Sequence, residues 1–246
     1  MKYFACLACC VFVVACSSGG TAPPQPAQST STTNSDLKRA VHWMRNSAEF
    51  HAIVLQTYSL AGQELRKSVE GKKPGTWAVA LDADETLISN MDYEKELVQL
   101  GMESTDELWA DWVAKQAAEP LPGALEFLGL IQELGGRIAV VTNRRDRDCP
   151  DTRANLEAFD IPFGVLLCRT EDGEKEPRWE KIENGTASEE IPAVEIVMWL
   201  GDNINDFPDM TQESRFSSPE AFSDYGTRFI IFPNPSYGSW QANPFD

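Results

Sequence analysis

Short apolar segments alternate with segments of helical periodicity along the chain after residue 70, and few fold classes accommodate this alternation. Each apolar segment is typical of a strand that is buried on both faces of a sheet. Such segments lie at residues 77–81, 137–141, 164–168, 195–200 and 228–232. Helical spacing is found between them, at residues 121–134, 151–159 and 175–182. The alternation predicts an α/β domain with a mainly parallel sheet and helices on both faces.

A longer helical stretch precedes the first predicted strand. Residues 36–70 carry apolar side chains near helical spacing, and Gly71 and then Pro74 end the pattern. Because 42% of the residues are hydrophobic, the chain can build a packed core, and we expect residues 36–246 to form the folded part. The net charge of −17 repels the phosphates of nucleic acid, which excludes nucleic acid as the main partner. A small phosphorylated substrate is compatible with this charge where a local cation reverses the field.

Residues 1–16 have the pattern of an export signal. Lys2 is followed by an apolar run over residues 3–15, which is too short to span a bilayer as a helix. The run ends in the letters VVAC, a sequence similar to the bacterial lipoprotein cleavage box, which implies lipidation of Cys16 and removal of residues 1–15. An ordinary signal peptide is the alternative. The lipoprotein interpretation predicts a protein of the cell envelope that is anchored to the membrane, in a bacterium to the outer membrane, through Cys16.

The segment that follows has the composition of a tether. Residues 17–35 contain no charged and no large apolar side chain, so they cannot bury enough surface to fold. We therefore expect residues 16–35 to be a disordered, lipidated linker.

Two cysteines belong to the folded part. Four of the six cysteines lie within residues 1–16, and the others are Cys149 and Cys168. An oxidising compartment permits a disulfide between them, but the sequence is equally compatible with two buried free thiols.

Carboxylates directly follow the first predicted strand. Asp82 and Asp84 stand two positions apart, and residues i and i+2 of an extended segment project to the same side. Two neighbouring carboxylates repel each other, and a divalent cation relieves the repulsion. Their hard oxygen ligands suit Mg²⁺. The alternative is an acidic loop that caps the next helix.

Polar residues also follow two later strands. Thr142 and Asn143 can offer a hydroxyl and backbone N–H groups to phosphate oxygens, although in isolation a simple N-cap or turn is the favoured explanation. Asp202 and Asp206 add carboxylates, for which a turn rich in Asx residues is the alternative. In parallel α/β sheets, ligands bind beyond the carboxyl ends of the strands. Three polar clusters at three strand ends therefore indicate one site.

Taken in order, these residues resemble the four motifs of the haloacid dehalogenase (HAD) superfamily. The motifs are Asp82-x-Asp84-Glu85-Thr86, Val141-Thr142-Asn143-Arg144, Lys175 and Gly201-Asp202-x-x-x-Asp206. The chain is more closely similar to the class C acid phosphatases, the lipoprotein 5′-nucleotidase group. This similarity covers residues 40–240 and includes Trp109-x-x-Trp112, Pro122-Gly123-Ala124, Lys175-x-x-Arg178 and Pro233-Asn234-x-x-Tyr237-Gly238-x-Trp240.

The resemblance implies a fold and a reaction. The fold would be HAD-like (Rossmann-like), with residues 92–118 inserted as a small helical cap. The reaction would be Mg²⁺-dependent hydrolysis of a phosphate monoester, as in an acid phosphatase or 5′-nucleotidase. Asp82 would be the nucleophile that forms an aspartyl-phosphate, and Asp84 would act as general acid and then general base. Lys175, rather than Lys181, would offset the negative charge.

The resemblance also implies a set of ligands. The metal would be held by Asp82, by Asp84 through its backbone carbonyl, and by Asp202. Asp206 would support Lys175 or a bound water from behind. Thr142 and Asn143 would hold the phosphoryl oxygens.

The substrate is less constrained. The group typically has Asn-Ser-Pro-Tyr after the first motif, whereas this chain has Asn90-Met-Asp-Tyr93, so an aromatic clamp for a nucleobase is altered. Tyr93, Tyr237 and Trp240 are candidates for the substrate pocket, and the last two are equally compatible with anchoring the C-terminal segment. A nucleoside monophosphate is the expected substrate. A sugar-phosphate phosphatase and a non-catalytic surface lipoprotein that uses the fold for binding are the alternatives, and a homodimer stays open.

Overall fold

The computed structural model describes residues 30–170, 173–189 and 191–244. The predicted export signal, Cys16 and residues 16–29 of the predicted tether lie outside the described residues. Residues 30–35, which the composition assigns to the tether, form the start of a helix. None of the described helices is both long and apolar enough to cross a membrane.

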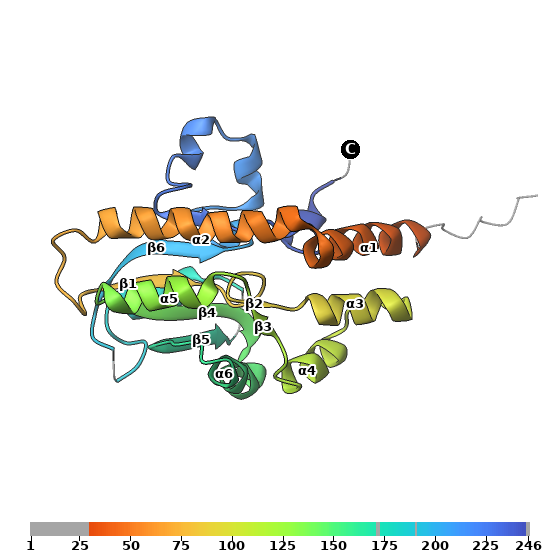
Figure 1. Cartoon of the computed structure of the whole chain (residues 1–246), viewed down its shortest axis with the longest axis horizontal. Coiled ribbons are helices and arrows are strands. Elements are labelled where there is room, and N and C mark those ends of the chain that lie inside the picture. The colour runs from red at the N-terminus through yellow and green to blue at the C-terminus, as the bar shows by residue number, and fades with distance from the viewer. Residues whose placement is uncertain (1–29, 171–172, 190, 245–246) are drawn as a thin grey trace, which may run out of the picture.

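A parallel sheet forms the centre of the molecule (Figure 1). Within the described residues it has five strands in the order β5-β4-β1-β6-β7, and every neighbouring pair is parallel. The strands are β1 (Trp77–Leu81), β4 (Arg137–Arg145), β5 (Val165–Arg169), β6 (Glu195–Gly201) and β7 (Phe229–Ile231). The predicted α/β fold with a mainly parallel sheet is confirmed, and β1 lies in the middle of it.

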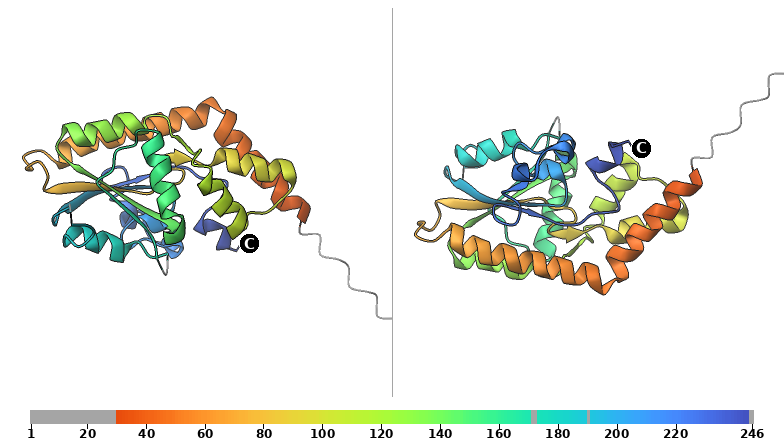
Figure 2. Two further views of the ribbon diagram at one scale, coloured as in Figure 1. Left: turned by 90° about the horizontal axis from the view of Figure 1, so that it is seen from below. Right: turned by 90° about the horizontal axis from the view of Figure 1, so that it is seen from above.

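Helices cover both faces of the sheet (Figure 2). One face packs against α2 (Ala48–Ser68), α5 (Ala124–Glu133) and α6 (Cys149–Ala158), and the other against α7 (Glu176–Glu183). Successive side chains of β1 point to opposite faces of the sheet, as the period of two in a strand requires. Val79 and Leu81 belong to the cluster with α2 and α5, whereas Ala78 and Ala80 belong to the cluster with α7.

The predicted helix over residues 36–70 is in fact two helices. α1 (Thr30–Asn46) and α2 meet at Ser47, where φ is −91° and ψ is 139°. The Ser47 hydroxyl accepts a hydrogen bond from the backbone N–H of Phe50 at 3.0 Å, so Ser47 is the N-cap of α2. Apolar periodicity continues through the break, which explains why it did not mark the boundary.

Two short helices fill the segment predicted to be a cap. α3 (Met91–Leu100) and α4 (Asp106–Ala114) are inserted between β1 and β4, and Figure 1 shows them at the end of the molecule toward which the strands point. The antiparallel pair β2 (Ile88–Ser89) and β3 (Glu119–Pro120) joins the two ends of the insertion. The insertion therefore lies on the side of the sheet where ligands of parallel α/β folds bind.

Candidate active site

The carboxyl ends of β1 and β6 bring acidic residues together. The two strands are parallel neighbours, so Asp82 after β1 and Asp202 after β6 lie at the same edge of the sheet. Asp206 follows on the short 3-10 helix Ile204–Asp206. One carboxylate oxygen each of Asp82, Asp202 and Asp206 lies within 4.8 Å of the others. A cluster of carboxylate oxygens of this kind is the donor set that hard divalent cations such as Mg²⁺ prefer, so the residues fit such a metal.

Lys175 is buried against this cluster. Its ammonium nitrogen lies 2.5 Å from Oδ1 of Asp82 and 2.6 Å from Oδ1 of Asp206. Its side chain is only 2% exposed. Asp206 is fixed from its other oxygen, because Oδ2 accepts the backbone N–H of Asn203 at 2.9 Å. Lys181, the alternative cation, is exposed on α7.

Burial and mutual repulsion shift the ionisation of the cluster. Burial raises the pKa of Asp82 to about 7, because desolvation and the neighbouring carboxylates outweigh the attraction of Lys175. Burial, followed by repulsion from Asp206 and Asp82, raises the pKa of Asp202 well above its usual value. For Lys175, burial acts to lower the pKa, but the attraction of Asp206 and Asp82 prevails and raises it. An added cation would relieve the repulsion among these carboxylates.

The Asp84 side chain points to a different partner. Its Oδ1 accepts hydrogen bonds from Arg144 Nε at 2.9 Å and Nη2 at 2.7 Å. Arg144 follows the phosphate-binding candidates on β4, and its side chain is 1% exposed. The carboxylate of Asp84 is therefore outside the three-aspartate cluster. The predicted metal contact through its backbone carbonyl does not need this side chain.

Arg178 orients the part of β4 that is predicted to bind phosphate. Its Nη1 donates to the carbonyl oxygen of Thr142 at 2.5 Å, and its Nη2 donates to Oδ1 of Asn143 at 2.6 Å. The Thr142 hydroxyl is buried and accepts the backbone N–H of Arg144 at 3.1 Å, whereas Asn143 is exposed. One guanidinium thus orients two consecutive candidate residues.

Sequence reasoning assigned no role in the site to three residues, Asn90, Arg144 and Arg178. Each had been noticed only as part of a family pattern. The position of Arg178 three residues after Lys175, on the first turn of α7, was a usable signal, because such residues share a helix face. Arg144 directly follows Asn143, which was also a signal.

The three aromatic candidates differ in environment. Tyr93 is 4% exposed, and its ring lies 5.3 Å from that of Trp109 and 6.0 Å from that of Trp112, so it packs inside the cap. Tyr237 is half-buried and packs against the main core. Trp240 is 44% exposed and, with Asp202, lines a cavity of 240 Å³ beside the acidic cluster.

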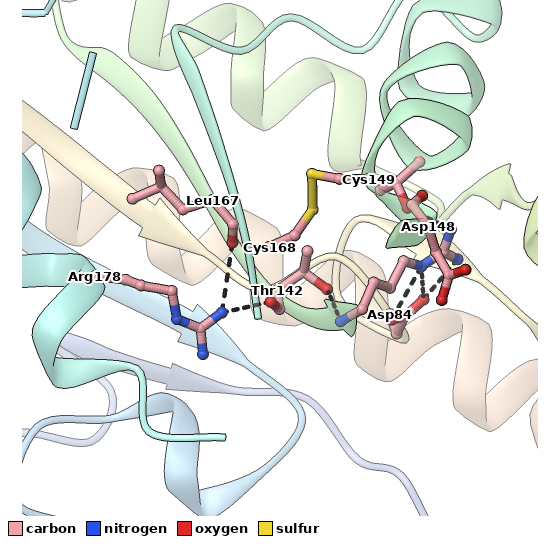
Figure 3. The surroundings of a disulfide bond; sticks show 9 residues. Asp84, Thr142, Asp148, Cys149, Leu167, Cys168 and Arg178 are labelled. Atoms are coloured by element: carbon pink, nitrogen blue, oxygen red, sulfur yellow. Dashed lines mark hydrogen bonds and ion pairs between the residues drawn. A yellow bond between two sulfur atoms is a disulfide. The ribbon is translucent and has the colours of Figure 1, made fainter. Parts of the chain in front are cut away.

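A disulfide joins Cys149, at the start of α6, to Cys168 in β5, with 6.0 Å between their Cα atoms (Figure 3). The sequence is equally compatible with a disulfide and with two free thiols, and the structure contains the bond. Cys168 follows Leu167, whose carbonyl oxygen lies 3.5 Å from Nη1 of Arg178. The disulfide therefore holds the strand next to β4 near the phosphate-binding candidates.

Comparisons with known proteins agree with this geometry. The family model described as HAD superfamily, subfamily IIIB (Acid phosphatase), matches residues 14–240. The structure of the class C acid phosphatase from Bacillus anthracis is similar, with a TM-score of 0.75 and 27% sequence identity over 85% of this chain and 88% of that chain. The same Bacillus anthracis enzyme with tungstate bound gives a TM-score of 0.76 and 28% identity over the same shares.

Proposed function

This chain belongs to the acid phosphatase subfamily IIIB of the HAD superfamily and is a phosphoric monoester hydrolase, and we propose that it works through an aspartyl-phosphate on Asp82 with the help of Mg²⁺. The observation that carries the proposal is the buried contact of Asp82 with Lys175 beside two further carboxylates. A carboxylate in this setting is held in one orientation at the end of β1. The relative from Bacillus anthracis binds tungstate, a tetrahedral oxyanion of the same shape as phosphate, which supports a site for an oxyanion here.

In the first step of the proposed mechanism, a carboxylate oxygen of Asp82 forms a bond to phosphorus while the bond from phosphorus to the leaving oxygen breaks. Asp84 gives a proton to the leaving oxygen. In the second step, water attacks phosphorus and Asp84 takes a proton from it, which releases inorganic phosphate and restores Asp82. Lys175 balances the charge of Asp82 and of the phosphoryl group in both steps.

We assign the ligands of metal and phosphate from the donors at the site. Asp82 and Asp202, with the backbone carbonyl of Asp84, would hold the metal, which when bound supplies positive charge to the phosphoryl oxygens. Thr142 and Asn143 would hold those oxygens from the β4 side. Asp206 would keep Lys175 in place through its 2.6 Å ion pair.

The proposed substrates are small phosphate monoesters, with nucleoside 5′-monophosphates as the first candidates. The exposed ring of Trp240 beside Asp202 supports a substrate that carries an aromatic base, since it lines the adjacent cavity of 240 Å³. The packing of Tyr93 inside the cap favours a reduced aromatic clamp, which is compatible with sugar phosphates as well. A panel of nucleoside monophosphates, nicotinamide mononucleotide and sugar phosphates distinguishes the two classes by kcat/KM.

One further proposal concerns the N-terminus, and the oligomeric state can be measured directly. We propose that Cys16 is lipidated and anchors the protein in the cell envelope, because the VVAC sequence and the uncharged segment after it fit a lipoprotein. Labelling with a radioactive fatty acid should be lost in Cys16→Ser. Light scattering of the lipid-free protein would decide between a monomer and a homodimer.

The proposed nucleophile is tested by Asp82→Asn. This variant should fold, because Lys175 keeps its ion pair with Asp206, but it should not hydrolyse p-nitrophenyl phosphate. Asp92→Asn, which changes an exposed carboxylate on α3 paired with Arg45, serves as the matched control and should keep full activity. Activity of Asp82→Asn in a clean preparation would remove Asp82 as the nucleophile.

Metal dependence is tested on the wild-type protein. Treatment with EDTA should abolish activity, and Mg²⁺ should restore it. Activity that does not respond to chelation would end the metal proposal while leaving the phosphatase assignment in place.

A further inference from the structure

Asp84 is held by a buried polar cluster that also includes Asn90 and Arg144. Arg144 is 2% exposed, and Asn90 is fully buried. Both side chains come from segments that flank the site, β4 and the turn before α3. Buried polar groups are costly unless all of their hydrogen-bonding capacity is used, so the pattern of bonds in this cluster is informative.

The two carboxylate oxygens of Asp84 have different surroundings. Oδ1 accepts three hydrogen bonds, from Arg144 Nε at 2.9 Å, Arg144 Nη2 at 2.7 Å and Asn90 Nδ2 at 2.7 Å. Among the described residues, Oδ2 accepts a single hydrogen bond, from Arg144 Nε at 3.2 Å. A carboxylate oxygen has about two lone-pair sites, and neither a guanidinium nor an amide gives up its proton. Oδ1 is therefore saturated, and a proton on Asp84 must reside on Oδ2.

Asn90 has no unused polar group. Its Nδ2 donates to Asp84 and, at 3.1 Å, to Oε2 of Glu85, while its Oδ1 accepts from Arg144 Nη2 at 3.0 Å and from Trp112 Nε1 at 2.8 Å. Its backbone N–H donates to Oε1 of Glu85 at 2.6 Å. The reversed amide would face two carboxylates with an oxygen and two donors with an NH₂ group. This fixes the orientation of the amide.

The cluster extends into the cap. Trp112 lies on α4 and reaches Asn90 through its indole N–H. Trp109, one turn earlier on α4, covers the guanidinium of Arg144, with 5.4 Å between the ring centre and Cζ. The position of α4 and the orientation of Asp84 are therefore connected through the buried side chains of Trp112 and Asn90.

We propose that Arg144 and Asn90 are positioning residues that lock Oδ1 of Asp84 and leave Oδ2 as the oxygen that carries the proton to the leaving group. This inference rests on the proposed function. In the step concerned, the O–H bond at Oδ2 breaks, the proton joins the leaving oxygen, and the electron pair of the broken P–O bond stays on that oxygen. Arg144 and Asn90 neither gain nor lose a proton.

The test compares two leaving groups. p-Nitrophenolate leaves without protonation, whereas the alkoxide of glycerol phosphate needs a proton, so only the second reaction depends strongly on the orientation of Asp84. In Arg144→Met, kcat/KM for glycerol phosphate should fall by about 10²-fold, and that for p-nitrophenyl phosphate by less than about 10-fold. Asp84→Asn should shift the ratio in the same direction. Inhibition by inorganic phosphate should not change in Arg144→Met, because Thr142 and Asn143 are retained.

The matched control is Arg145→Met. Arg145 is the next residue and, like Arg144, pairs with a carboxylate. Its partner is Asp106 on α4, at 2.5 Å, and not Asp84. This variant should leave both rates unchanged, since an ion pair whose carboxylate is exposed contributes little.

Equal losses on the two substrates, or no loss, in Arg144→Met would overturn the proposal. If this variant does not fold, Arg144→Lys decides the question, because it keeps the charge but loses the two-pronged contact. A smaller shift of the ratio in the same direction supports the proposal, and an unchanged ratio refutes it. A wild-type protein inactive on both substrates would instead refute the proposed function.

Discussion

The ammonium nitrogen of Lys175 lies 2.5 Å from Oδ1 of Asp82, and both side chains are buried. Lys175 reaches Asp82 from the N-terminal end of α7, on the face of the sheet opposite to α2 and α5. A second carboxylate, that of Asp206, contacts the same ammonium group at 2.6 Å. One cation therefore lies between two buried carboxylates, and we expect both the stability of the site and the proposed catalysis to depend on it.

Replacing Lys175 with Met should lower both the stability of the protein and its activity. The variant leaves Asp82 and Asp206 without their buried counter-charge, which should lower the free energy of unfolding by roughly 3–5 kcal/mol in the presence of EDTA. Urea denaturation measures this loss, and added Mg²⁺ should recover part of it because a divalent cation replaces the missing charge. Hydrolysis of p-nitrophenyl phosphate should be lost. Lys181→Met, on the exposed side of α7, is the control and should keep its activity. If Lys181→Met were inactive and Lys175→Met active, Lys181 would be the residue that offsets the negative charge.

Residue 201 must be a glycine because Asp206 lies too close to leave room for a Cβ atom. A Cβ atom at residue 201 would lie 2.3 Å from Cβ and from Oδ2 of Asp206, which is closer than real contacts allow. Gly201→Ala should therefore displace Asp206 and with it Lys175, and kcat/KM should fall about 10²-fold, the effect typical of a misplaced catalytic group. Gly129→Ala on α5 is the matched control, since its Cβ meets nothing within 4 Å. Normal kinetics in Gly201→Ala would contradict this reading of the strand end.

The disulfide should contribute to stability rather than to chemistry. Cys149 and Cys168 are 19 residues apart, and closing a loop of this length stabilises a fold by about 3 kcal/mol in the chain-entropy model. Cys149→Ala/Cys168→Ala should lower Tm, and dithiothreitol should lower the Tm of the wild type but not of the variant. The kcat near room temperature should stay close to that of the wild type. Two thiols that react freely in the untreated protein would show that the bond does not form.

Glu94 should make the stability depend on pH. It is 6% exposed on α3, and burial raises its pKa from 4.5 to about 7. The folded chain therefore holds a proton that the unfolded chain releases between these two values, so stability falls as pH rises from 4.5 to 7. Glu94→Gln should gain up to about 3 kcal/mol over the wild type at pH 8 and nothing below pH 4.5. Thermal melts across this range measure the difference, and the exposed Glu96→Gln should not reproduce it.

The sheet was predictable from the sequence because its signals are local. The strands are short, apolar and followed by polar residues, and the predicted segment 77–81 coincides with β1. The contact of Lys175 with Asp82 was expected from family resemblance, since the two residues are 93 positions apart and no periodicity connects them. The break at Ser47 was missed because a serine cap interrupts a helix without interrupting the apolar spacing.

The polar support of the site could not be predicted from spacing. Arg144 meets Asp84 across 60 positions, and Arg178 meets Asn143 across 35. Which acceptor a buried guanidinium reaches depends on the packing of strands and helices around it, and that is decided only in the folded chain.

The hydrogen bonds from Trp112 to Asn90 and from Asn90 to Asp84 should limit which sequence changes the inserted segment tolerates during evolution. An insertion between two strands is normally a part that a lineage can exchange to reach new substrates while the chemistry at the sheet stays the same. Here α4 carries Trp112, which contacts Asn90 and through it the proposed general acid Asp84, so exchanging the whole insertion would also remove part of the proposed support for catalysis. New substrate specificities are therefore expected to arise by substitutions around a retained Trp112. Substitutions in the C-terminal segment near Trp240 are the second expected route, because the link from Trp112 to Asp84 does not pass through that segment.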